Sequence, residues 1–78
     1  MPDIVIDGQS FDEDCQHALK LMKGYGGRME LDDMCRSKYA TSFGHLMFTG
    51  AISHPAAGES TFRPLGTRIL REVEGQGT

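Results

Sequence analysis

The chain has no tryptophan and only two cysteines, Cys15 and Cys35, among its 78 residues. Zinc sites usually present pairs of closely spaced Cys or His ligands, and these two cysteines do not form such a pair. Two cysteines at this spacing also form no disulfide framework, so we expect reduced thiols, as in the cytoplasm. The sequence therefore predicts no metal site and no cofactor, and we expect Cys15 to be a core thiol.

Long apolar runs are missing too. No segment approaches the roughly 20 apolar residues of a transmembrane helix. The first residues lack the basic and apolar regions of a signal peptide. We therefore expect no membrane partner and a cytoplasmic location.

The motifs of common catalytic sites are also absent. The sequence contains no Gly-rich phosphate loop, no nucleophile elbow and no His-Glu-x-x-His pattern. A chain of 78 residues forms one small domain with little room for a deep pocket. These absences favour a binding module over an enzyme, with no catalytic residues.

Charge is unevenly distributed along the chain. The net charge is −3, and eight of the 11 acidic residues precede Met34. No Asp or Glu lies between Met34 and Gly58, whereas the second half carries five of the eight basic residues. A locally positive surface can therefore coexist with a negative total charge, and the local field steers a ligand.

The N-terminal third predicts a short strand followed by a helix. Residues 4–6 are β-like and end at an Asp7-Gly8 turn, so residues 1–9 form an arm or strand. Ser10 and Glu13 match a capping box at the start of a helix, and Gly24 is the expected stop. The apolar stripe of this helix is Phe11, Cys15, Ala18, Leu19 and Met22.

The middle of the chain predicts a brief strand and two helices. The strand covers residues 29–31, and a short helix capped by Glu30 or Asp32 runs to about Ser37 with its apolar residues inward. After a turn at residues 37–40, Thr41 or Ser42 caps a second helix that ends at Gly50. Its two faces are Phe43, Leu46, Met47 and Gly50 on one side, and Thr41, Gly44, His45 and Phe48 on the other. The inward residues expected in the short helix are Leu31, Met34 and Cys35.

The last third predicts a two-stranded ribbon and a helix. Residues 51–53 start one strand, residues 54–59 form a loop, and residues 60–63 form the returning strand. Pro64 suits the first turn of the final helix, and residues 75–78 form a disordered tail. The apolar stripe of that helix is Leu65, Ile69, Leu70 and Val73.

This order of elements resembles the winged helix-turn-helix family. Leu46 and Gly50-Ala51-Ile52 match the end of its second helix, and Phe62, Pro64, Leu65-Gly66 and Ile69-Leu70 match the entry into its last helix. Arg63 stands where the family usually has Thr. The resemblance implies an α+β fold: a small winged helix-turn-helix domain over residues 10–74, mainly helical with a β-hairpin wing.

The resemblance implies a small DNA-binding protein that regulates transcription. Its second helix would place Thr41, Ser42 and His45 at base edges of double-stranded DNA, while Arg36, Lys38 and Arg63 would contact phosphates. One short helix gives few contacts, so a homodimer is expected. The sequence departs from the usual pattern because no Lys, Arg, Asn or Gln lies between Thr41 and Gly50.

An alternative is a protein–protein interaction module on the same scaffold. His45, Met47 and Phe48 would then form the interface, since an exposed aromatic beside methionine suits a protein surface. A small phage or mobile-element inhibitor of a host complex would be of this kind. A continuous apolar patch over the helix of residues 41–48 favours this alternative, and a continuous basic strip favours DNA.

Overall fold

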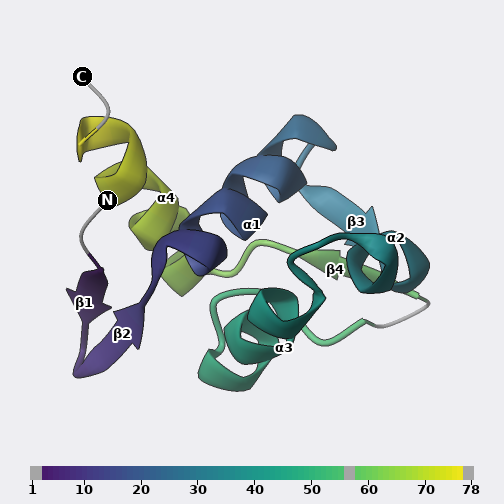
Figure 1. The fold of residues 1–78 in the computed structure, drawn as a ribbon, viewed down its shortest axis with the longest axis horizontal. Helices are drawn as coiled ribbons and strands as arrows, with labels where there is room; N and C mark the ends of the chain where they lie inside the picture. The colour runs from purple at the N-terminus through teal and green to yellow at the C-terminus, as the bar shows by residue number, and fades with distance from the viewer. Residues whose placement is uncertain (1–2, 56–57, 77–78) are drawn as a thin grey trace.

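The computed structural model describes residues 3–55 and 58–76, which form an α+β fold of four helices and two small antiparallel sheets (Figure 1). In chain order the elements are β1 (Ile4–Ile6), β2 (Gln9–Phe11), α1 (Glu13–Gly24), β3 (Arg28–Glu30), α2 (Leu31–Arg36), α3 (Ala40–Thr49), β4 (Glu59–Thr61) and α4 (Pro64–Gln76). The predicted α+β class is confirmed. Among the described residues, no helix is long and apolar enough to cross a membrane.

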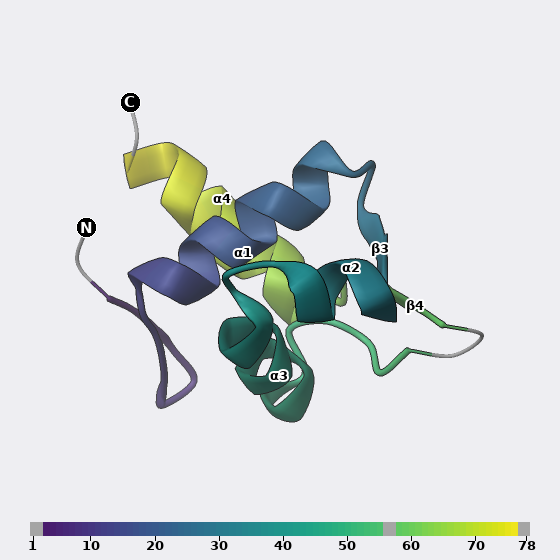
Figure 2. The same ribbon diagram turned by 45° about the vertical axis from the view of Figure 1, so that its right-hand side comes forward.

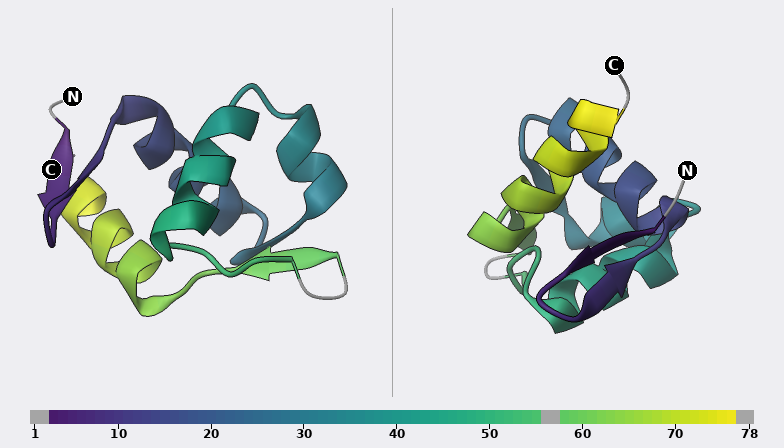
Figure 3. Two further views of the ribbon diagram at one scale, coloured as in Figure 1. Left: turned by 90° about the horizontal axis from the view of Figure 1, so that it is seen from below. Right: turned by 90° about the vertical axis from the view of Figure 1, so that its left-hand side faces the viewer.

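Strands β1 and β2 form a hairpin at one end of the molecule (Figures 1 and 3). Asp7 and Gly8 connect them with φ angles of 54° and 80°, and two positive φ angles in a row suit a tight hairpin turn. The predicted strand and turn are therefore confirmed, and the strand pairs within the chain. The N-terminal arm was expected to end at residue 9 and the domain to begin at residue 10, but strand β2 includes both residues.

The predicted capping box is wrong because Ser10 belongs to β2. Its hydroxyl donates to the Asp3 carboxylate at 3.2 Å. Asp12 takes the N-cap position of α1 instead, and its carboxylate accepts the backbone N–H of Cys15 at 2.9 Å. Ser and Asp cap helices about equally well, and pairing with β1 keeps residues 9–11 extended.

Helix α1 ends at Gly24 as predicted, but the left-handed position just beyond its C-cap, Tyr25, belongs to Gly26 and not to Gly24. Gly24 is the last residue of α1, and the left-handed residues that follow it are Gly26 and Gly27, with φ of 88° and 91°. The N–H of Gly27 donates to the carbonyl of Met22, and that of Gly26 to the carbonyl of Lys23, both at 3.0 Å. This pair of bonds is a Schellman motif, which satisfies the last carbonyls of the helix.

The second sheet joins segments far apart in the sequence. Strands β3 and β4 pair with Met29 opposite Ser60, at the end of the molecule away from the β1–β2 hairpin (Figure 3). The expected ribbon of residues 51–53 and 60–63 is reduced to a single bridge between Ile52 and Phe62. Residues 56–57 of the expected loop lie outside the described residues. The sequence did not predict β3 as the main partner of β4, because no local pattern specifies so distant a pairing.

Helix α3 begins without the predicted side-chain cap. Tyr39 holds the N-cap position, and Thr41 and Ser42 lie inside the helix. The turn before α3 is held by Ser37, whose hydroxyl donates to the Met34 carbonyl at 2.8 Å and accepts the N–H of Tyr39 at 3.2 Å. Gly50 ends the helix as predicted, with a left-handed φ of 87°.

Helix α2 is shorter and less buried than predicted. Glu30 precedes it without a capping hydrogen bond from its side chain, so that predicted cap is not made. Of the three residues expected inside, Met34 is buried, whereas Leu31 and Cys35 are exposed. A six-residue helix makes fewer than two turns, and it places only one side chain in the core.

Helix α1 lies at the centre of the core and packs against α3 and α4 (Figures 1 and 2). Four residues of its predicted stripe are buried on the helix, namely Cys15, Ala18, Leu19 and Met22, whereas the fifth, Phe11, is buried from strand β2. Helices α3 and α4 bury most of their predicted apolar residues against it, while Met47 and Leu65 are partly buried. The buried residues are Phe43 and Leu46 from α3, and Ile69, Leu70 and Val73 from α4.

Helix α4 starts in close contact with the segment that follows α3. A Cβ atom at Gly66 would lie 2.1 Å from the carbonyl oxygen of Ala51, so only glycine allows this approach. The N–H of Arg63 donates to the same oxygen at 3.1 Å. Helix α4 extends to Gln76, two residues into the expected tail, and residues 77–78 lie outside the described part.

Candidate interaction surface

The exposed face of α3 carries no Lys, Arg, Asp or Glu. It consists, as predicted, of Thr41, Gly44, His45 and Phe48. Phe48 is the most prominent, with 87% of its surface exposed. A single exposed apolar side chain carries little information, so its surroundings decide whether it marks a binding surface.

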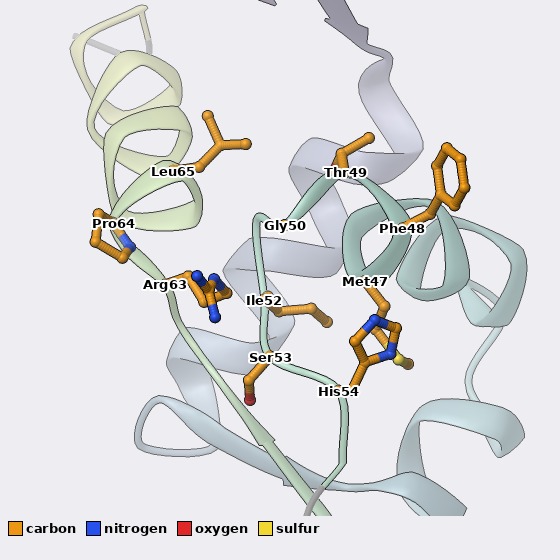
Figure 4. A pocket seen from close by; sticks show the side chains of 10 residues that line it. All are labelled: Met47, Phe48, Thr49, Gly50, Ile52, Ser53, His54, Arg63, Pro64 and Leu65. Atoms are coloured by element: carbon orange, nitrogen blue, oxygen red, sulfur yellow. The ribbon is translucent and has the colours of Figure 1, made fainter.

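A hollow of about 510 Å³ lies beside Phe48, between the C-terminal end of α3 and the start of α4 (Figure 4). We call it the α3–α4 hollow. Its apolar lining comes from Met47, Phe48, Ile52, Pro64 and Leu65. The left-handed Gly50 turns the chain so that residues 52–54 form part of the same hollow. Phe48 therefore belongs to a larger, partly apolar surface.

Arg63 lines the α3–α4 hollow together with His54. Figure 4 shows the Arg63 side chain pointing from the segment before α4 toward Ile52. In residues 3–55 and 58–76, the guanidinium of Arg63 makes no ion pair, and no carboxylate lines the hollow. The hollow thus combines apolar walls with one uncompensated positive charge.

A second hollow, of about 360 Å³, lies at the N-terminal end of α3. We call it the α1–α3 hollow. Thr41, Ser42 and His45, the residues predicted to read bases, all line it. The carboxylates of Asp3 and Asp12 line it as well, and a carboxylate repels DNA phosphates.

Cys15 lies in the wall of the α1–α3 hollow and is 3% exposed. Burial raises the pKa of its thiol from the ordinary 9.0 to about 11, and the nearby Asp12 carboxylate adds to this increase. The thiol is therefore protonated at neutral pH and is a poor nucleophile and a poor metal ligand. Cys15 is buried in the core, as predicted.

Arg36 and Lys38 are exposed at the end of α2 and in the turn before α3. Neither makes an ion pair within the described ranges, and the Lys38 ammonium lies 5.3 Å from the centre of the Tyr39 ring. The six residues predicted for DNA are thus divided. Three line the α1–α3 hollow, two lie at the α2–α3 turn, and Arg63 lies in the α3–α4 hollow with Met47 and Phe48.

The sequence reasoning missed Ile52, Pro64 and Leu65 as parts of this surface. Pro64 and Leu65 were assigned only to the last helix, and Ile52 only to a strand. These residues come together because Gly66 contacts Ala51, and this contact places the start of α4 against the segment that follows α3. That contact joins residues distant in sequence and has no local pattern.

No cluster of three or more His, Cys, Asp or Glu residues suited to a metal ion occurs in the described part of the chain. Comparisons with protein-family models, curated proteins and solved structures found no match.

Proposed function

We propose that this chain is a small winged-helix domain that binds another protein through the C-terminal end of α3. The winged-helix part of the proposal is supported by the order of helix, turn, helix, paired strands and final helix. The β-structure in that order comes from β4 and the bridge between Ile52 and Phe62. Met47 and Phe48 are the main contact residues, with His45 one turn earlier on the exposed face.

The observation that carries the proposal is the exposure of Phe48 beside an apolar hollow. Phe48 is 87% exposed, and the α3–α4 hollow next to it is lined by Met47, Pro64 and Leu65. Aromatic and methionine side chains are enriched at protein interfaces, where a partner removes them from water. Full burial of one such side chain contributes about 1.5–3 kcal/mol.

Site-specific photo-crosslinking in extracts of the source organism tests this proposal. The variant Phe48→benzoylphenylalanine should crosslink to a discrete protein in DNase-treated extract. The matched control is Val5→benzoylphenylalanine, because Val5 is also exposed, at 65%, but lies on the β1–β2 hairpin. Equal crosslinking from both positions, or none from position 48, would contradict the proposal.

DNA binding is a second proposal, and the exposed cations flanking α3 favour it. Arg36 and Lys38 lie before α3 and Arg63 after it, and none of them makes an ion pair within the described ranges. Such a protein would bind as a homodimer and regulate transcription. The carboxylates of Asp3 and Asp12 beside Thr41 and His45 weigh against base reading there.

A salt titration of binding to random duplex DNA separates the two proposals. Phosphate contacts make affinity fall steeply with salt, so a DNA binder shows clear binding at low salt. Charge reversal of Arg36 and Lys38 together should abolish it, while the uncharged substitution Phe48→Ala should leave it unchanged. Absence of binding at low salt would end the DNA proposal.

A further inference from the structure

The α3–α4 hollow carries a positive charge, so its partner should carry a negative charge there. Among the residues that the structure describes, Arg63 is the one Lys or Arg in its lining, and no Asp or Glu lines it. The nearest part of the chain keeps the same character, because residues 34–58 contain no acid at all. The other arginines flanking the sheets differ: Arg28 pairs with Glu59 at 3.7 Å and Arg68 with Asp7 at 3.9 Å.

We propose that the hollow binds a peptide segment of a partner protein in which an acidic residue lies next to an apolar residue. An Asp or Glu side chain of that segment pairs with the guanidinium of Arg63, and a neighbouring apolar side chain packs on Phe48 and Leu65. This inference rests on the proposed protein-binding function and adds the chemistry of the partner. Its basis is charge complementarity to Arg63, which makes no ion pair among the described residues, in a partly apolar hollow whose described lining contains no acid.

The arrangement suits a carboxylate particularly well. A guanidinium binds a carboxylate through two parallel N–H···O bonds, which also fixes the direction of the peptide. When apolar groups exclude water around the pair, the electrostatic attraction is stronger than on an open surface. Phe48, Pro64 and Leu65 line the same hollow as Arg63 and would help to exclude water once a peptide lies across them.

A phosphate group of a nucleic acid would also pair with Arg63, yet the rest of the hollow does not suit it. Nucleic-acid surfaces place several cations along the backbone. Here the remaining lining residues include Met47, Phe48 and Leu65, which a phosphate backbone does not contact favourably. The observations therefore favour a peptide, and DNA becomes an outcome of the test.

Selection from a displayed library of random peptides tests the inference with the full chain as bait. The expected binders carry Asp or Glu near an aromatic or aliphatic residue. Their affinity, measured by titration of synthetic peptides, should fall about ten-fold or more with Arg63→Glu, the loss expected for a hydrogen-bonded charge. Arg63→Lys should give an intermediate loss because the ammonium keeps the charge but not the two parallel bonds.

Two controls make the selection specific. Arg71→Glu reverses an exposed cation on α4 that lies outside the hollow, and it should leave peptide affinity unchanged. A charge-swapped peptide, with Lys in place of its acid, should bind the Arg63→Glu variant better than it binds the original chain. Circular dichroism confirms that each variant is folded, which is expected because the Arg63 side chain is exposed.

The outcomes distinguish the inference from the proposed function. Peptides that need Phe48 but lack acids, and that ignore Arg63→Glu, would overturn the inference and leave protein binding standing. If no peptide prefers the original chain over Phe48→Asp, the protein-binding proposal itself fails. Random duplex DNA that binds through Arg63 and displaces the peptides would overturn the inference in favour of DNA.

Discussion

The two ends of α3 (Ala40–Thr49) border hollows of opposite character. The N-terminal end faces the carboxylates of Asp3 and Asp12, whereas the C-terminal end faces the guanidinium of Arg63 and several apolar side chains. The helix itself carries no Lys, Arg, Asp or Glu. Its surroundings therefore set the charge at each end, namely the β1–β2 hairpin with α1 on one side and the β4–α4 junction on the other.

This difference shows why the residues of one helix do not reveal its partner. Thr41 and His45 were predicted to read bases on the basis of their chemistry, but they share a hollow with two acids. Phe48 lies on the same exposed face and near the opposite end, where Arg63 leaves the surface positive. If the two ends of α3 are independent, a substitution at one end should leave the structure of the other end unchanged.

The largest effect is expected from Gly66→Ala, which disrupts only the C-terminal end. The added methyl group would lie 2.1 Å from the Ala51 carbonyl oxygen, so α4 must shift away from α3. Overpacking of this kind costs about 1–3 kcal/mol, which urea denaturation measures. The matched control Gly44→Ala meets nothing within 4 Å and should stabilise α3 by about 0.5–1 kcal/mol. Equal stability of Gly66→Ala and the original chain would refute the close contact.

The next effect concerns pH at the N-terminal end. The pKa of Cys15 is raised from 9.0 to about 11, so the unfolded chain loses this proton at a lower pH than the folded chain does. Folding stability should therefore fall as pH rises from about 9 to about 11, by up to roughly 1.4 kcal/mol per pH unit. Below pH 9 this contribution is fully present.

The control for this pH dependence is Cys15→Ala. Unfolding measured from about pH 8 to about pH 11, a range that runs from below the ordinary pKa of the thiol to its raised pKa, should show a smaller alkaline loss in the variant. An identical slope in both proteins would mean that the Cys15 thiol is not buried as described.

A smaller effect is expected from Asp12→Ala, which removes the N-cap of α1. The carboxylate accepts the Cys15 N–H at 2.9 Å, and losing such a cap costs about 1 kcal/mol. Asp12→Asn keeps a capping oxygen and should cost much less, although it removes the same charge. A comparable loss in both variants, seen by thermal denaturation, would show that charge and not capping dominates at this position.

The smallest effect on stability is expected from Phe48→Ala. The ring is 87% exposed, so its removal should change the free energy of unfolding by no more than about 0.5 kcal/mol. The same variant should strongly reduce crosslinking or peptide binding if the C-terminal end is the interface. A loss of stability above about 1 kcal/mol would mean that the ring packs on the protein in solution.

The sequence predicted helical faces better than caps and pairings. The spacing of Phe43, Leu46 and Phe48 correctly separated buried from exposed sides of α3, because burial follows the helical period. The cap at Ser10 was wrong because two good capping residues stand close together, and the hairpin that selects Asp12 depends on residues 4–6.

The residues of the candidate site were predicted separately and for different functions. Met47 and Phe48 were identified as interface residues, but Arg63 was assigned to DNA phosphates and not to the same surface. Helix periodicity places side chains around one helix, and it gives no information about which neighbouring segment lies against it. The contact at Gly66 supplies that information, and it joins α4 to residue 51 through backbone atoms.

The ladder between β3 (Arg28–Glu30) and β4 (Glu59–Thr61) has a consequence for how the surface forms. It ties together the two ends of a segment that contains α2, α3 and most of the α3–α4 hollow. The chain must lose loop-closure entropy before either strand gains its partner. Helices α2 and α3 are therefore expected to open and close as one cooperative unit, so that the binding surface is either wholly assembled or absent.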